Sequence, residues 1–270
     1  MRTVWLLLVV AVATLTMGPL VILADLLGVP RRPGGIYDWA PRVWARAIVW
    51  ASGVELRIHG AEALAGSGRR VVVANHVSWF DIPVMVLTVP RFAAVAKQEL
   101  SRIWFFGRGA AKVGVVYIDR DNRKAAFEAY EAAAGAVREQ RNVVVFPEGT
   151  RGHEYALRPF KKGPFVLAVA AQSDVVPVVI HGTLPLGRGK DWRVDPSHVQ
   201  GVVDVHVLPA VSADGATYAD RNAIASRVHA RMAEFLHTHY AVPPRDAPTL
   251  SDDASHATPP SKAAPTLTTT

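Results

Sequence analysis

The sequence contains no cysteine among its 270 residues. This absence excludes disulfide bonds, thiolate metal sites and a cysteine nucleophile. No internal repeat is evident either. A chain of this length can form one sizeable domain with a hydrophobic core, together with appendages.

Acidic residues are in the minority, because 23 Asp and Glu stand against 30 Lys and Arg, for a formal net charge of +7. This balance favours an anionic partner, which could be a phosphorylated substrate, an acidic lipid surface or nucleic acid. The basic residues lack a recognised nucleic-acid motif, and a lipid-seeking segment precedes them. We therefore expect no nucleic-acid partner.

Charged residues are absent from residues 4–24, which are mostly apolar. As a helix this segment is about 30 Å long, close to the hydrocarbon thickness of a bilayer. A signal peptide is the alternative, but its basic region would be Arg2 alone and no small-residue cleavage site precedes Asp25. Gly18 and Pro19 interrupt the segment, so a kinked or shallowly inserted helix is as compatible with it as a straight span.

A second candidate helix covers residues 42–52. Its apolar side chains, Val43, Ala47 and Trp50, can share a face that either lies on a membrane or packs on the rest of the protein. Arginines are more numerous after the first segment than before it, which places the following chain on the cytoplasmic face of the cell membrane. We predict that residues 1–52 form N-terminal membrane anchor helices.

From residue 54 onward, valine-rich strand patterns alternate with helical ones. The helical patterns cover residues 122–139 and 218–239, and the predicted strands cover residues 54–59, 70–74, 93–96, 113–118, 142–146, 175–180 and 202–207. Apolar strands that alternate with helices predict an α/β fold, a mostly parallel sheet flanked by helices, over residues 53–243. Residues 244–270 have few large apolar groups and are predicted to be a disordered tail.

Three of the predicted strands end in reactive polar residues. Asn75 and His76 follow the first of them, Asp119 and Arg120 follow the second, and residues 147–151 follow the third. Ligands bind at the carboxyl ends of parallel strands, which share one edge of the sheet. We therefore expect these three clusters to converge, although each taken alone could be a turn, a helix cap or a surface ion pair.

His76 and Asp81 are a candidate catalytic pair. On a helix, residues five positions apart point away from each other, so the two meet only if His76 lies in a loop and the chain turns before the next helix. Asp81 could then bind one imidazole nitrogen and leave the other free to accept a proton. Such a pair suits acyl transfer from a thioester to an alcohol, since the alcohol is a poor nucleophile and needs a base.

Four motifs in order resemble those of the glycerolipid acyltransferase family. Residues 75–81 resemble its N-H-x-x-x-x-D signature, residues 114–120 its second motif, residues 146–151 its third and residues 176–180 its fourth. The resemblance covers about residues 54–240. Gly152 stands where the family often has serine.

The resemblance implies His76 as general base and Asp81 as its orienting partner. It also implies an acyl-acceptor site, with arginines on the acceptor phosphate, made of Arg120, Glu148, Gly149, Thr150, Arg151, Lys97 and Gly163. It further implies transfer to the sn-2 hydroxyl of 1-acylglycerol-3-phosphate (lysophosphatidic acid), with acyl-CoA or acyl carrier protein as donor, membrane lipid as a partner, and neither a metal nor another cofactor.

Three alternatives remain open at this stage. The acceptor could be another lyso-lipid or glycerol 3-phosphate, because the motifs report only a phosphate-sized anion. A metal-dependent phosphohydrolase could use His76, Asp81 and Glu148 as ligands. A non-catalytic membrane protein could bind acidic lipid through its basic residues.

Overall fold

The structure is a computed structural model that describes residues 2–65, 69–119, 123–139, 141–187 and 201–245. Seven strands form one sheet in the order β1-β7-β6-β2-β5-β3-β4. Their bounds are Glu55–His59 (β1), Arg70–Ala74 (β2), Phe92–Lys97 (β3), Val115–Ile118 (β4), Asn142–Val145 (β5), Val175–His181 (β6) and Val202–Val207 (β7). All seven predicted strand regions are confirmed as strands.

The sheet is mostly parallel. β6, β2, β5, β3 and β4 run in one direction, whereas β7 pairs antiparallel to β6 and parallel to β1. The carboxyl ends of β2, β4 and β5 therefore share one edge. This confirms the predicted common edge for the strands that precede the three polar clusters.

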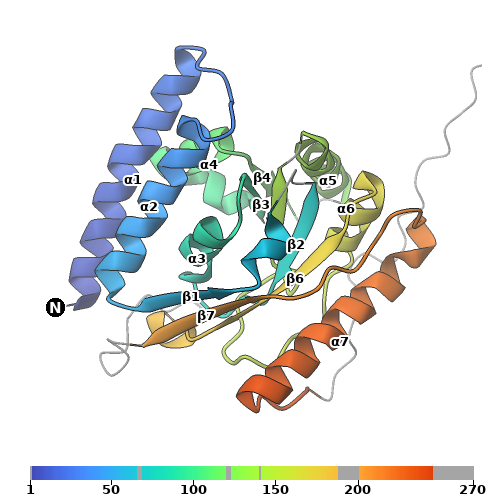
Figure 1. Ribbon diagram of the computed structural model, residues 1–270. Helices are drawn as coiled ribbons and strands as arrows, with labels where there is room; N and C mark the ends of the chain where they lie inside the picture. The colour runs from blue at the N-terminus through green and yellow to red at the C-terminus, as the bar shows by residue number, and fades with distance from the viewer. Residues whose placement is uncertain (1, 66–68, 120–122, 140, 188–200, 246–270) are drawn as a thin grey trace, which may run out of the picture.

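Helices cover both faces of the sheet, as Figure 1 shows. The helices α1, α2 and α3 lie on one side with α4 beside them, and α5, α6 and α7 lie on the other. Their bounds are Arg2–Leu26 (α1), Ile36–Ser52 (α2), Asp81–Thr88 (α3), Trp104–Lys112 (α4), Arg123–Arg138 (α5), Gly163–Ala171 (α6) and Arg221–Tyr240 (α7). The two predicted helices of the domain are confirmed as α5 and α7, although α7 is preceded by a short 3-10 turn at Tyr218–Asp220.

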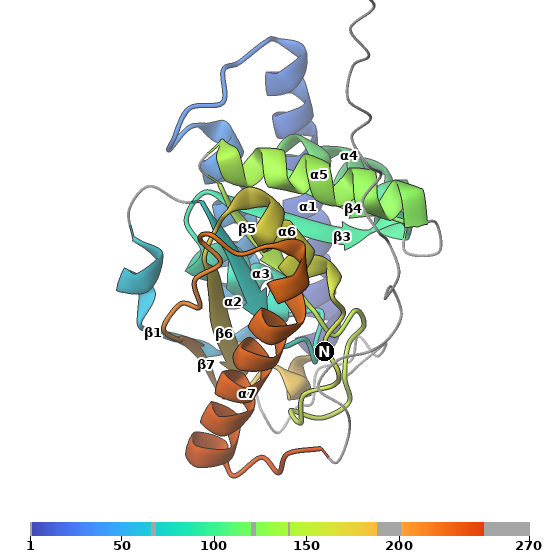
Figure 2. The same ribbon diagram turned by 90° about the vertical axis from the view of Figure 1, so that its right-hand side faces the viewer.

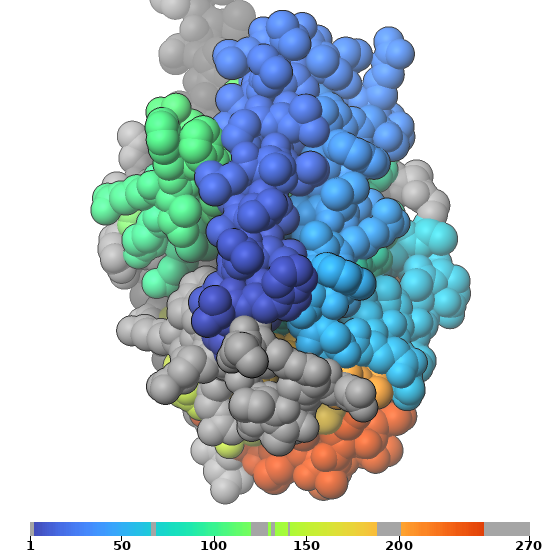
Figure 3. All heavy atoms as spheres, turned by 90° about the vertical axis from the view of Figure 1, so that its left-hand side faces the viewer, coloured from blue at the N-terminus to red at the C-terminus, as the bar shows by residue number. Residues whose placement is uncertain are grey.

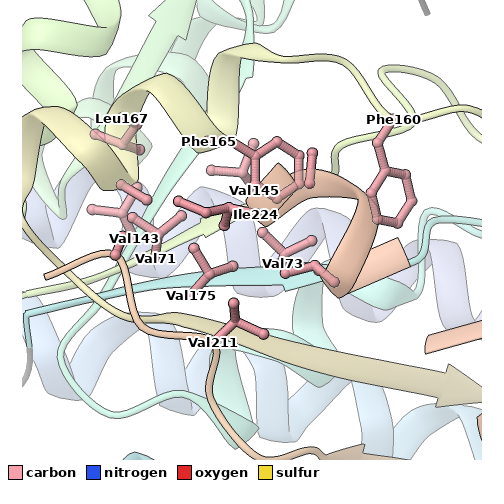
Figure 4. Close-up of a cluster of buried hydrophobic side chains, with 14 of the residues drawn as sticks. Val71, Val73, Val143, Val145, Phe160, Phe165, Leu167, Val175, Val211 and Ile224 are labelled. Carbon is pink, nitrogen blue, oxygen red and sulfur yellow. The ribbon is translucent and has the colours of Figure 1, made fainter. Parts of the chain in front are cut away.

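The core lies on both faces of the sheet because successive side chains of a strand point in opposite directions. In β2, Val71 and Val73 pack with the helices of one layer, whereas Val72 and Ala74 pack with those of the other. Figure 4 shows the first of these clusters, in which Val71 and Val73 lie near Phe165 of α6. The valine-rich strands thus hold the two helical layers together.

The N-terminal helices form a hairpin that is packed on the domain. The α1 helix continues through Gly18 and Pro19 without ending, although these residues interrupt the apolar segment. A Cβ at Gly18 would lie 3.0 Å from the Phe105 carbonyl oxygen, so this glycine allows α4 to approach α1 closely. Leu6 of α1 and Ile48 of α2 are buried together in the core cluster between these helices and the sheet.

Candidate active site

His76 and Asp81 are in contact. β2 ends at Ala74, the intervening loop carries His76, and Asp81 is the first residue of α3. The His76 Nδ1 atom lies 2.8 Å from Asp81 Oδ2. The chain therefore turns before the helix begins, as the spacing of the two residues required.

The Asp81 carboxylate is completely buried and accepts hydrogen bonds from several donors. Oδ2 accepts from the backbone N–H groups of Val77 at 2.8 Å and Ser78 at 2.9 Å, in addition to its contact with His76. Oδ1 accepts from the Thr183 hydroxyl at 2.6 Å. Because a buried carboxylate is costly unless its oxygens are paired, these donors compensate its burial and fix its orientation.

Thr183 is a residue of the site that the sequence analysis missed. It follows β6 and is completely buried. The Tyr155 hydroxyl accepts hydrogen bonds from the backbone N–H groups on both sides of it, Gly182 at 2.7 Å and Leu184 at 3.0 Å. The signal in the sequence was its position after a buried parallel strand, at the same sheet edge as His76.

The His76 ring is also held by an aromatic neighbour that was not predicted. It stacks on Phe146, with ring centroids 4.0 Å apart and an interplanar angle of 18°. The His76 side chain keeps 14% exposure. With Nδ1 directed to Asp81, Nε2 is the ring nitrogen available to a substrate.

The buried Glu148 side chain links the loop after β5 to the loop after β2. Its side chain is buried, and Oε1 accepts from the His76 backbone N–H at 2.9 Å while Oε2 accepts from the Arg158 backbone N–H at 3.1 Å. Burial raises the pKa of Glu148 to about 7. Both oxygens therefore contact the protein's own backbone, which ties the third motif to the first.

The remaining third-motif residues lie close to the pair. Gly149 has a φ of +77°, a left-handed conformation that favours glycine. The next residue, Thr150, is exposed, and Arg151 is half-buried. Burial lowers the pKa of Arg151 while the negative charge of Asp81 raises it, so the guanidinium lies within electrostatic range of the pair. The loop closes where the Gly152 N–H donates to the His76 carbonyl at 2.7 Å.

Two of the other predicted acceptor residues, Lys97 and Gly163, belong to other elements of the fold. Lys97 ends β3, is half exposed, and places Nζ 3.9 Å from a Glu99 carboxylate oxygen. Gly163 begins α6, where a Cβ would collide with the Tyr130 hydroxyl, so packing of α6 against α5 requires glycine there. Arg120 lies outside the described residues.

The structure contains an apolar cavity next to the N-terminal helices. It lies among α1, α2, α3 and α4, and its lining includes Ile82, the residue after Asp81, together with Met17, Trp44 and Phe106. Almost all of its lining surface is apolar. A hydrocarbon chain is the kind of ligand that such a lining suits.

The outer surface of α1 is rich in exposed apolar side chains. Leu8, Leu15 and Leu26 are more than half exposed, as are Trp50 of α2 and Trp104 of α4. In Figure 3, α1 lies across one face of the molecule between α2 and α4. The most apolar 18-residue stretch within residues 3–26 has a mean hydropathy of 2.6, and this helix is long and apolar enough to cross a membrane.

Comparison with known proteins identifies the family of this chain. Residues 55–181 match the family model named Acyltransferase. The human 1-acyl-sn-glycerol-3-phosphate acyltransferase beta is 32% identical over 197 residues, which cover 72% of this chain and 69% of that protein. The chain belongs to the acyltransferase family.

Two further comparisons agree with this assignment. The alpha form of the human enzyme is 36% identical over 189 residues, which cover 68% of this chain and 65% of that protein. The chain thus spans slightly less than two thirds of that relative. The crystal structure of the 1-acyl-sn-glycerophosphate (LPA) acyltransferase PlsC from Thermotoga maritima has the same fold, with a TM-score of 0.74 and 22% identity over 90% of this chain and 97% of that one.

Proposed function

We propose that this protein transfers a fatty acyl group from acyl-CoA or acyl carrier protein to the free sn-2 hydroxyl of 1-acylglycerol-3-phosphate, giving phosphatidic acid. The single observation that carries the reaction type is the His76–Asp81 contact, at the edge where the β2 and β5 loops meet. The names of the similar proteins support the acceptor.

In the proposed reaction His76 acts as a general base. Its Nδ1–H donates to Asp81, so Nε2 carries a lone pair that takes the proton of the acceptor hydroxyl as its oxygen attacks the thioester carbonyl. The tetrahedral intermediate then expels the thiolate, to which the imidazolium returns a proton. No acyl-enzyme forms, because the nucleophile belongs to the acceptor.

The phosphate of the acceptor is assigned to the basic residues beside the pair. Among the basic residues that the structure describes, Arg151 is the best placed, since its guanidinium interacts electrostatically with the Asp81 carboxylate. A fixed phosphate would hold the hydroxyl near Nε2, which lowers the entropic cost of reaction. We include Arg120, Lys97, Thr150, Gly149 and Gly163 in the acceptor site on the resemblance, and we propose Glu148 as the residue that positions its loop.

The proposed acceptor is a membrane lipid, and the apolar surface of the protein suits a substrate from that source. The exposed apolar face of α1 is proposed to enter the cell membrane, with the catalytic domain on the cytoplasmic side. The apolar cavity beside Ile82 is proposed to hold an acyl chain. The acyl chains of the donor and of the acceptor would then both stay out of water.

An acceptor panel tests the proposed function. Purified protein receives labelled acyl-CoA or acyl carrier protein with lysophosphatidic acid, other lysophospholipids, glycerol 3-phosphate or monoacylglycerol. We expect phosphatidic acid as the main product and no release of inorganic phosphate. Faster transfer to a different acceptor would replace the substrate assignment, and phosphate release dependent on added metal would favour a phosphohydrolase.

A further inference from the structure

A second cluster of polar side chains lies at the opposite end of the sheet order from β4, on the edge strand β1 and its neighbour β7. His59 is the last residue of β1, and Asp204 and His206 belong to β7. His59 Nε2 is 3.0 Å from Asp204 Oδ1, and the His59 and His206 rings stack with centroids 4.5 Å apart. These residues have no part in the acyl-transfer site.

The strand register places these three side chains together. His59 pairs with His206 in the parallel β1–β7 ladder, so the two rings stand on the same face of the sheet. Asp204 lies two positions before His206 and therefore on that face as well. The backbone fixes the positions of all three Cβ atoms, and only side-chain rotations remain to adjust the cluster.

We propose that His59, Asp204 and His206 bind a divalent transition-metal ion, with Zn²⁺ as the reference ion. One ligand atom from each residue lies within 4.8 Å of the other two. Ligand atoms on a tetrahedral zinc are about 3.3 Å apart, since each lies about 2.0–2.2 Å from the metal. The His59 side chain is half exposed and can rotate to close the difference. Two imidazoles and a carboxylate are a common zinc donor set.

The His206 ring has a supporting contact of the kind that metal-binding histidines have. Its Nε2 atom is 2.6 Å from the Tyr240 hydroxyl at the end of α7, and Phe235 of the same helix packs on the ring. A hydrogen bond at one ring nitrogen fixes the ring orientation and leaves the other nitrogen for the metal. Figure 2 shows α7 lying across β6 and β7, the position from which it supplies this contact.

A bound ion would join β1 to β7. Among the strands that the structure describes, the edge strand β1 pairs with β7 alone, and this link would gain a metal bridge in addition to the ladder. Three protein ligands leave one tetrahedral position for water, so the site is accessible to exchange. We therefore expect reversible binding that stabilises the fold and requires neither acyl donor nor acceptor.

Isothermal titration of tag-free, EDTA-treated, dialysed full-length protein with Zn²⁺ tests the site. We expect one ion per chain for the wild type and at least a ten-fold weaker affinity for His59→Asn and, separately, for Asp204→Asn. Tyr240→Phe keeps the ring and removes only the hydroxyl, and it should weaken binding by about 10–100-fold. His237→Asn removes an exposed histidine of α7 outside the cluster and should bind as the wild type does.

Thermal unfolding with and without Zn²⁺ provides a second readout in the same variants. At a zinc concentration near the wild-type Kd, zinc should raise the melting temperature of the wild type and of His237→Asn clearly more than that of His59→Asn. The proposal is overturned if the wild type binds no zinc, or if His59→Asn and Asp204→Asn both bind it with wild-type affinity. Neither readout uses catalysis, so this result is independent of the proposed acyl transfer.

Discussion

Thr183 and Asp81 are 102 residues apart in the chain, yet the Thr183 hydroxyl donates a 2.6 Å hydrogen bond to Asp81 Oδ1. The other carboxylate oxygen, Oδ2, contacts His76. Thr183 therefore fixes the carboxylate plane that in turn fixes the imidazole. It acts through Asp81 and is a positioning residue.

We predict that Thr183→Val lowers kcat by about ten-fold and changes KM little. The substitution keeps the volume and removes a hydrogen bond to a buried charged group, which costs about 1.5–3 kcal/mol. Steady-state kinetics with lysophosphatidic acid measure the effect, with Thr183→Ser expected to restore most of the loss. Thr88→Val is the matched control, because the buried Thr88 hydroxyl donates only to the Val84 carbonyl within α3. Equal losses in both valine variants would contradict the positioning role.

Glu148 should make stability depend on pH. Burial raises its pKa from 4.5 to about 7, so the folded state binds more protons than the unfolded state between these values. The stabilising effect is complete below pH 4.5 and is lost as the pH rises through about 7. This shift corresponds to a change of about 3 kcal/mol in the free energy of unfolding across that pH range. The melting temperature of the wild type should therefore fall between pH 5 and 8 relative to that of Glu148→Gln, which cannot titrate, and parallel curves would exclude this role.

Arg151→Ala should mainly weaken acceptor binding. We expect KM for lysophosphatidic acid to rise by at least ten-fold, since a charged hydrogen bond to phosphate is lost. Monoacylglycerol has no phosphate and provides the internal comparison, because wild type and variant should use it equally slowly. If the variant lost the same factor with both acceptors, Arg151 would not be the phosphate ligand.

The exposed face of α1 should control membrane binding. Leu8 and Leu15 are seven residues apart and both more than half exposed, so they lie on one face of the helix. The double substitution Leu8→Asp and Leu15→Asp should reduce flotation with phospholipid vesicles by at least about ten-fold, because carboxylates enter the apolar layer poorly. Thr238→Asp adds an acidic group at an exposed position of α7 and should float as the wild type does. Unchanged flotation of the Leu variant would exclude α1 as the anchor.

Much of the sheet could be predicted from the sequence because its strands are short, valine-rich and bounded by polar residues. The convergence of the first and third motifs also followed from the parallel order, and the contact from the His76 N–H to Glu148 confirms it. The cluster of Asp119 and Arg120 is only partly tested, since Arg120 lies outside the described residues. The predicted role of each site residue stays a prediction.

Other features lay beyond the sequence patterns for physical reasons. The helices α3, α4 and α6 have eight or nine residues, too few for a clear helical period, and α6 is apolar on nearly every side because it is buried. Gly18 was interpreted as a helix interruption, but it serves the close approach of α4. The position of Thr183 after a strand was a weak signal, because a threonine there is common and its partner Asp81 is distant in the chain.

The most direct measurement of the central claim compares single-turnover acyl transfer by the wild type and His76→Ala. His153→Ala, an exposed histidine in the loop after the third motif, is the control. We predict that His76→Ala loses at least about 100-fold in rate, still binds lysophosphatidic acid with near wild-type affinity, and differs from His153→Ala, which keeps its rate. Equal rates for His76→Ala and the wild type would contradict the assignment of His76 as the base.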